Sequence, residues 1–241
     1  MVTRKSLLLA VAIVLALAGS AGAGLVIISR HEPTFYRRTA VPPGEGRRRL
    51  SGEFVTEFAR LIDGVLNKKW NARFTEEQIN SYLEEDFLRQ HTAECPLPEG
   101  ISEPRIALDT NRIRLGFRYG AGHWNTVISL DIHVWLVPKE TNLVAFEFLG
   151  MHAGAMPISA HGWLERQLDG IRRRNIDASW YRHHGHPVLL LRFQADRSTP
   201  TFRLQELNLH PGLLSVTGHS IESAPQDAVS QAIDGLSKPR A

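Results

Sequence analysis

The sequence contains a single cysteine, Cys95, among 241 residues. An intramolecular disulfide is therefore impossible, and so is a zinc site built from several cysteines. The motifs of common enzyme classes are missing too: there is no P-loop, no G-x-G-x-x-G, no H-E-x-x-H and no G-x-S-x-G. A net charge of +3 is too small to predict nucleic-acid binding. With 43% hydrophobic and 22% charged residues, the chain has a globular composition and must be held by an apolar core.

One uncharged, mostly apolar run is present, from Leu7 to Ile28, and Arg4 and Lys5 precede it. As a helix with a rise of ~1.5 Å per residue it would reach ~33 Å, about the thickness of a bilayer core. Ala21-Gly22-Ala23 is a small-residue site of the kind at which signal peptides are cleaved, but the apolar run continues past it. We therefore expect residues 1–29 to be an uncleaved single-pass signal anchor. A cleaved signal peptide and a buried core helix are the alternatives.

Residues 30–50 are rich in proline, glycine and arginine and show neither a helical nor a strand period, so we expect a basic tether there. Its arginines are either simply solvated or attracted to anionic lipid headgroups. The excess of arginine after the apolar run would place the large domain in the cytoplasm by the positive-inside rule. The export-like N-terminus favours the opposite, extracytoplasmic side, which is the location that we expect.

Residues 51–222 are expected to form one α+β domain, with a polar tail over 223–241. Apolar residues at helical spacing from Phe54 to Leu66 predict one helix, and a T-x-x-Q capping box at Thr75 and Gln78 opens a second. A short inserted helix is expected after Ser159, with Leu164, Leu168 and Ile171 on one face. Period-two alternation predicts strands at 113–119, 128–136, 144–148, 176–181, 188–193, 202–209 and 213–217. The expected fold is an N-terminal transmembrane helix, then a curved antiparallel meander packed against the two helices and the inserted one.

Three histidines, His183, His184 and His186, stand in "WYRHHGHPVLLLRF" (180–193). Alternation on both sides predicts a hairpin with His184-Gly185 in the turn, because glycine and, to a lesser extent, histidine accept positive φ. Neighbouring residues on a tight turn rarely converge on one metal ion, so we expect exposed histidines and no metal. Asp131 and His133 share a strand face, which predicts a solvated surface rather than an acid–base pair.

The order of features, with "FTEEQINSYL" (Thr75 to Asn80) and the closing "LQELNLHPGLLSVTG" (Leu207 to Gly218), resembles small membrane-anchored bacterial proteins of unknown function. Their extracytoplasmic domains are similar to tubular lipid-binding (BPI-like) modules, and the resemblance covers residues 50–220. It implies a long helix along a curved sheet, with space for acyl chains between them. It implies no catalytic residues.

The strand faces carry large apolar side chains that form either a filled core or the lining of an apolar groove. The residues expected to line such a groove are Phe117, Tyr119, Ile128, Leu130, Ile132, Val134, Phe146 and Phe148. Ten buried lipid methylenes would contribute ~8 kcal/mol before ordering costs. Our first hypothesis is a membrane-anchored lipid-binding module with no catalytic activity, cofactor or metal. A scaffold domain of an envelope complex with a filled core is the second, and a histidine-dependent hydrolase or metal enzyme the third.

Overall fold

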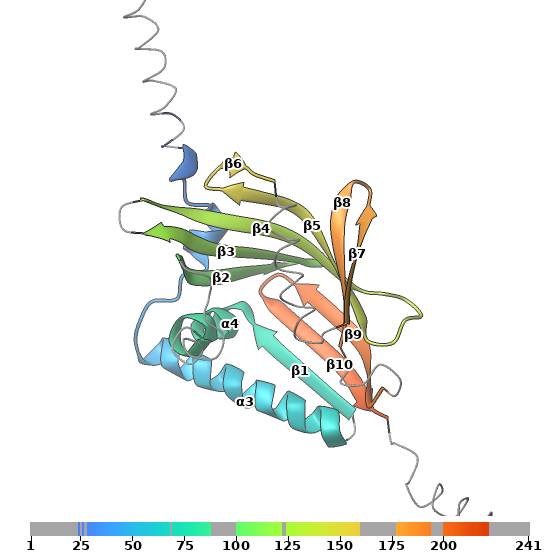
Figure 1. Ribbon diagram of the computed structural model, residues 1–241. Helices are drawn as coiled ribbons and strands as arrows, with labels where there is room; N and C mark the ends of the chain where they lie inside the picture. The colour runs from blue at the N-terminus through green and yellow to red at the C-terminus, as the bar shows by residue number, and fades with distance from the viewer. Residues whose placement is uncertain are drawn as a thin grey trace, which may run out of the picture.

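The computed structural model describes residues 24, 26, 28–67, 69–87, 100–121, 124–159, 177–193 and 200–221. The fold is mixed, with helices near the N-terminus and antiparallel strands after them, as the sequence predicts (Figure 1). In chain order the elements are α2 (Thr34–Arg38), α3 (Glu45–Asn67), β1 (Lys69–Thr75), α4 (Glu76–Tyr82), the π-helical turn η1 (Leu83–Phe87), β2 (Ile101–Asp109), β3 (Arg112–Ala121), β4 (Trp124–Leu136), β5 (Leu143–Ala153), β6 (Met156–Pro157), β7 (Asp177–His183), β8 (His186–Arg192), β9 (Phe202–His210) and β10 (Leu213–Ser220).

The strands form two sheets rather than the single curved sheet that the sequence pattern suggested. The larger one has the order β2-β3-β4-β5-β8-β7, with β6 added beside β5, and the smaller one has the order β1-β10-β9. Strand β1 was not predicted, although its burial alternates along its whole length. Because β1 pairs with β10, a segment before the meander is joined to the end of the domain.

The apolar core lies between the two sheets. Register places Phe117 opposite Ile128, and Ile132 opposite Phe148, so one face of the larger sheet is apolar from strand to strand. Leu209 of β9 belongs to the same buried cluster, and partly buried leucines of β9 and β10 pack against it. The smaller sheet therefore covers part of the apolar face of the larger one.

The helices pack mainly beside the smaller sheet, which corrects the expectation that they cover the meander. Helix α3 runs along β1 (Figure 1), and Phe54 on its inner face lies 5.1 Å from the Phe74 ring and 4.5 Å from the Tyr82 ring. Helix α4 begins at the predicted cap: Gln78 N donates to Thr75 Oγ1, and Thr75 N donates to the Gln78 side chain. It contacts the outer edge of β2.

The expectation that residues 30–50 form a tether without helical structure is wrong for two parts of this segment. Residues 34–38 and 45–50 are helical, and Tyr36 is fully buried. A Cβ on Gly116 of β3 would overlap the Tyr36 ring, so this glycine makes room for α2 on the outer face of the larger sheet. The segment is therefore part of the domain.

Several expectations fall on residues outside the described ranges. These are most of the apolar run Leu7–Ile28, the inserted helix after Ser159 and the tail 223–241. Within the described part of the chain, no helix combines the length and apolarity needed to span a bilayer.

Candidate functional site

The eight apolar residues expected to line a groove are placed mostly in the core. Five of them are buried: Phe117, Ile128, Leu130, Ile132 and Val134. Phe146 and Phe148 are partly buried and pack against the same cluster. Tyr119 differs, because its side chain is 51% exposed at the end of β3, opposite Thr126 of β4. The register thus brings these residues onto one face, and most of that face is packed by protein.

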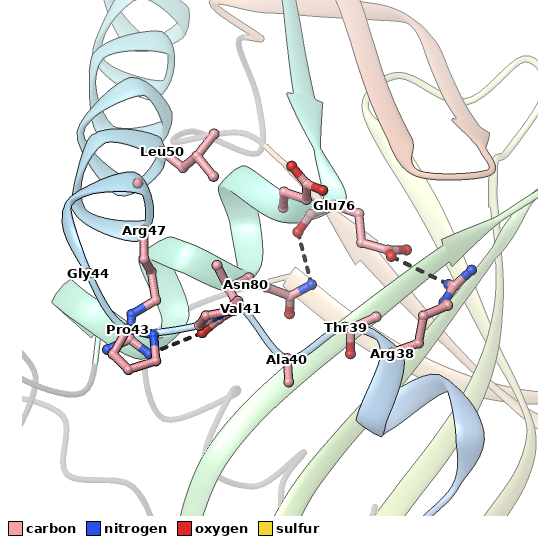
Figure 2. A pocket seen from close by; sticks show the side chains of 13 residues that line it. Arg38, Thr39, Ala40, Val41, Pro43, Gly44, Arg47, Leu50, Glu76 and Asn80 are labelled. Carbon is pink, nitrogen blue, oxygen red and sulfur yellow. Dashed lines mark hydrogen bonds and ion pairs between the residues drawn. The ribbon is translucent and has the colours of Figure 1, made fainter.

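Among the surface pockets are four that described residues line, and none of the eight apolar residues lines any of these four. One, of about 580 Å³, lies between the segment from Arg38 to Gly44, the start of α3 and the start of α4 (Figure 2). Two of its arginines bond to other groups of the lining. Arg38 pairs with Glu76 at 3.4 Å, and Arg47 donates to the carbonyl of Val41 at 3.3 Å. This pocket lies where three elements meet, and Arg38 and Arg47 connect them.

Charged side chains beside the pocket form a continuous chain of ion pairs. It crosses from the segment before α2, through β3, β2 and η1, to α3. The pairs are Glu32–Arg118 (2.5 Å), Arg118–Glu103 (3.1 Å), Glu103–Arg105 (3.2 Å), Arg105–Glu84 (3.0 Å), Glu84–Arg47 (2.6 Å) and Arg47–Glu85 (2.7 Å). Arg47, expected in the tether as a solvated or headgroup-binding cation, is instead mostly buried between two glutamates.

Tyr36 lies inside this network. Its hydroxyl donates to the carbonyl of Glu103 at 2.7 Å, and the Arg105 guanidinium lies 4.5 Å from its ring centre. Burial raises the pKa of the Tyr36 phenol well above its ordinary value, and the neighbouring arginines only partly oppose this. The phenol therefore stays neutral throughout the physiological range and acts as a structural hydrogen-bond donor.

The histidine hairpin has the predicted geometry. His183 of β7 pairs with His186 of β8, and the two residues between them have positive φ, 48° at His184 and 86° at Gly185. This is a two-residue turn that glycine favours. His183 and His184 are exposed and His186 is partly exposed. His152 and His219 lie on β5 and β10, and His161 is outside the described residues.

A site that sequence reasoning missed lies on the outer face of the larger sheet. His133 Nδ1 is 3.3 Å from one carboxylate oxygen of Glu147, and His183 Nδ1 is 3.5 Å from the other. The Glu147 side chain is only 9% exposed, and the Trp135 ring lies between the two imidazoles, 4.9 Å from His133 and 6.4 Å from His183. Asp131, which shares the strand face with His133, pairs with Arg112 instead.

The carboxylate of Glu147 can orient two imidazoles, as a catalytic carboxylate orients one. Within the described part of the chain, however, no set of three histidine, cysteine or acidic side chains is placed to hold a metal ion. The four pockets lie elsewhere. Alternation in β5 indicated that Glu147 faces away from the core, but the approach of His183 depends on the pairing of β5, β8 and β7, which no local pattern contains.

Comparison with known proteins gives no match: no protein-family model, no curated protein and no solved structure corresponds to this chain. The resemblance to tubular lipid-binding modules therefore stays a prediction.

Proposed function

We propose that the chain is a membrane-anchored, non-catalytic scaffold domain, and that the outward face of α3 binds a protein partner. One observation carries this proposal. Val55, Phe58 and Ile62 on α3 are 44%, 49% and 50% exposed, whereas the apolar residues of the larger sheet are mostly packed in the core. We call Val55, Phe58 and Ile62 the α3 stripe.

The α3 stripe stands out because α3 already has an apolar inner face. Phe54 fills that inner face against Phe74, and the ring of Phe58 stacks on Phe54 at 6.1 Å toward the outside. A surface helix ordinarily has one apolar face and one polar face. A second apolar face at the spacing i, i+3, i+7 is the pattern that recognises a partner helix. Because the three side chains are already about half buried, covering them contributes roughly 1 kcal/mol each before ordering costs.

The position of α3 favours a protein over the bilayer as the group that covers the stripe. Residues 24, 26 and 28–30, at the end of the proposed anchor, lie at the opposite side of the molecule from α3 (Figure 1). The exposed arginines Arg49 and Arg60 pair with Glu53 and Glu57 of the same helix and do not lie on the stripe. A partner helix with an apolar face fits this surface best.

The experiment is affinity purification of the full chain from its native membranes. The double variant Phe58→Ser with Ile62→Ser is compared with Phe193→Ser, a control because Phe193 is also exposed, at 47%, but lies outside α3. The wild type and the control should recover the same protein in a fixed ratio, and the double variant should lose it while keeping the wild-type melting temperature. Equal recovery by all three chains contradicts the proposal. Removing residues 222–241 should leave recovery unchanged, since the stripe is proposed to bind another protein rather than this segment.

The binding of a lipid or another hydrophobic ligand is the second candidate function. Trp180 of β7 lies 5.6 Å from the Phe148 ring on the apolar side of the larger sheet, and its Nε1 is buried without a hydrogen-bond acceptor among the described residues. A buried donor of this kind suits a ligand with an acceptor, such as a lipid ester carbonyl. Native mass spectrometry of the purified full chain tests it: bound lipid in the wild type that is reduced in Trp180→Phe favours this candidate, and lipid-free protein opposes it.

A further inference from the structure

The last residues of the proposed anchor are bonded directly to the domain. Ala155 N donates to the carbonyl of Ile28 at 3.0 Å, and the Thr126 hydroxyl donates to the carbonyl of Ser29. A Cβ on Gly154 would overlap both carbonyls, so the turn between β5 and β6 accepts only glycine at this approach. No free linker separates the end of the apolar run from the meander.

These contacts all lie at one end of the larger sheet. Thr126, which holds Ser29, is the cross-strand partner of Tyr119. The β3–β4 connection and the β5–β6 turn lie at this end, and the β2–β3 and β4–β5 turns lie at the other. Figure 1 shows the described residues 24, 26 and 28–30 beside β6 and the tips of β3 and β4. We call this end, with Ile28, Tyr119, Ala155 and Pro157, the anchor end.

Charge distribution distinguishes the two ends of the meander. The stretches 119–130 and 148–164 contain no Asp, Glu, Lys or Arg, and their described residues, 119–121, 124–130 and 148–159, pass through the anchor end. The turns at the opposite end carry Asp109 and Arg112, or Lys139 and Glu140. Two long uncharged stretches that turn at the same place are unusual for a sheet end facing water.

Apolar and amphipathic side chains are exposed at the anchor end. Tyr119 is 51% exposed and Ile28 is 46% exposed, while Ala155 and Pro157 are also exposed. Tyrosine is enriched where a protein crosses the membrane–water interface, because its ring is apolar and its hydroxyl is hydrated. The charged side chains nearest this end, Arg30, Glu32 and Arg118, line a small pocket beside Thr126, and Glu32 pairs with Arg118. Basic side chains at this level can meet lipid headgroups.

We infer that the anchor end rests on the membrane–water interface, so that the domain is held in a fixed orientation with the α3 stripe directed away from the bilayer. This inference rests on the proposed function, since it requires the anchor. Direct bonding of Ile28 and Ser29 gives the domain little freedom to rotate about the membrane. The interface contact in turn buries Tyr119 and Ile28, the exposed side chains that flank the junction.

The test places single fluorescent labels on the full chain in phosphatidylcholine vesicles that contain a headgroup-linked quencher. In a Cys95→Ser background, Tyr119→Cys and Pro157→Cys report on the anchor end, while Lys139→Cys and Phe58→Cys are the controls. The first two labels should lose most of their emission, and the two control labels should keep theirs. Equal quenching at Tyr119→Cys and Lys139→Cys overturns the inference.

An alkaline carbonate wash of the same vesicles separates the possible failures. If the chain is released by the wash, the anchor is absent and the orientation falls with it. If the chain is retained but the anchor-end labels are not quenched, only the orientation is wrong. Partner binding at the α3 stripe is measured separately, by affinity purification. Its failure would leave the quenching of the anchor-end labels unchanged.

Discussion

The side-chain amide of Asn80 pairs with both backbone groups of Ile106 at the outer edge of β2. Asn80 Nδ2 donates to the Ile106 carbonyl at 2.8 Å, and Ile106 N donates to Asn80 Oδ1 at 2.8 Å. Asn80 is 1% exposed, so the pair is dry. Helix α4 thereby caps an edge strand that would otherwise present unpaired groups to another chain.

Replacing Asn80 with Ala should destabilise the domain by about 2–3 kcal/mol, because it leaves the Ile106 N–H and C=O buried without partners. Urea unfolding of both chains measures this change. Asn208→Ala is the matched control, since Asn208 is exposed and bonds only to Glu206 at 3.4 Å. A loss for Asn80→Ala no larger than the ~0.5 kcal/mol expected at the surface would contradict the role of the amide pair.

The side chain of Asn142 likewise bonds to backbone groups at an edge strand, in this case β9 of the smaller sheet. It is fully buried, donates to the Phe202 carbonyl at 2.7 Å and accepts from Leu204 N at 2.7 Å, at the free edge of β9. Its φ of 55° lies in the left-handed region. Asn142→Gly should lose about 2 kcal/mol through the missing hydrogen bonds, and Asn142→Ala about 1 kcal/mol more, because alanine also strains the backbone. Equal stability of the two variants in urea would refute the backbone contribution.

Tyr36 should make the domain sensitive to alkali. Burial raises the pKa of its phenol above the ordinary value, so the unfolded chain releases this proton at a lower pH than the folded chain. Below about pH 10 the Tyr36 phenol is neutral in both states, and the domain keeps its full stability. As pH rises further, the free energy of unfolding falls by about 1.4 kcal/mol per pH unit. Denaturant unfolding at pH 8, 10 and 11 should give a shallower decline for Tyr36→Phe. Parallel curves for the two chains would exclude Tyr36 as the cause.

Gly154 and Gly185 form a matched pair of glycines with positive φ, 61° and 86°. Alanine at Gly185 meets nothing within 4 Å, so Gly185→Ala should cost only the strain of about 1–2 kcal/mol. Alanine at Gly154 also overlaps the backbone of Ile28 and Ser29. Gly154→Ala should therefore cost more in thermal unfolding, and it should release residues 28–31 to faster hydrogen exchange. Equal exchange of this segment in both variants would show that the junction does not depend on Gly154.

The histidine hairpin should tolerate substitution. Changing His183, His184 and His186 together to Asn should alter the free energy of unfolding by less than about 1 kcal/mol, because these side chains are largely exposed and His133 still faces Glu147. Adding His133→Asn to this triple variant should lower the free energy of unfolding by more than His133→Asn does in the wild type, because Glu147 then has neither imidazole beside it. A chelator should not change the melting temperature of the wild type; a drop that the triple variant lacks would restore a metal-site interpretation.

Local patterns predicted the elements whose geometry is set by nearby residues. The capping box of Thr75 and Gln78 and the turn at His184-Gly185 are such cases, because the bonding groups are at most three residues apart. The alternating strands of the meander were predicted because the period-two order of apolar and polar side chains is also a local pattern. Burial of Trp70, Ala72 and Phe74 alternates in β1 too, but a short strand between two helices was not recognised from its sequence.

Features that depend on distant residues could not be predicted. Arg47 looks like a tether residue until Glu84 and Glu85 lie beside it, and this contact, with the bond from Ser51 to Asp86, joins the start of α3 to the domain. Asn80 and Asn142 look like ordinary polar residues, because the edges that they cover lie 26 residues away for Ile106 and 60 for Phe202. The approach of His183 to Glu147 likewise requires the register of three strands.

The proposed role of the α3 stripe is tested most directly by site-specific photocrosslinking from Phe58 in native membranes. With a photoreactive residue in place of Phe58, the full chain should form one defined protein adduct. That adduct should disappear when Ile62→Asp is added, and a photoreactive residue at Lys139, in the exposed β4–β5 turn, should not produce it. The account would be contradicted if the photoreactive residue in place of Phe58 formed no protein adduct, or if its adduct persisted when Ile62→Asp was added.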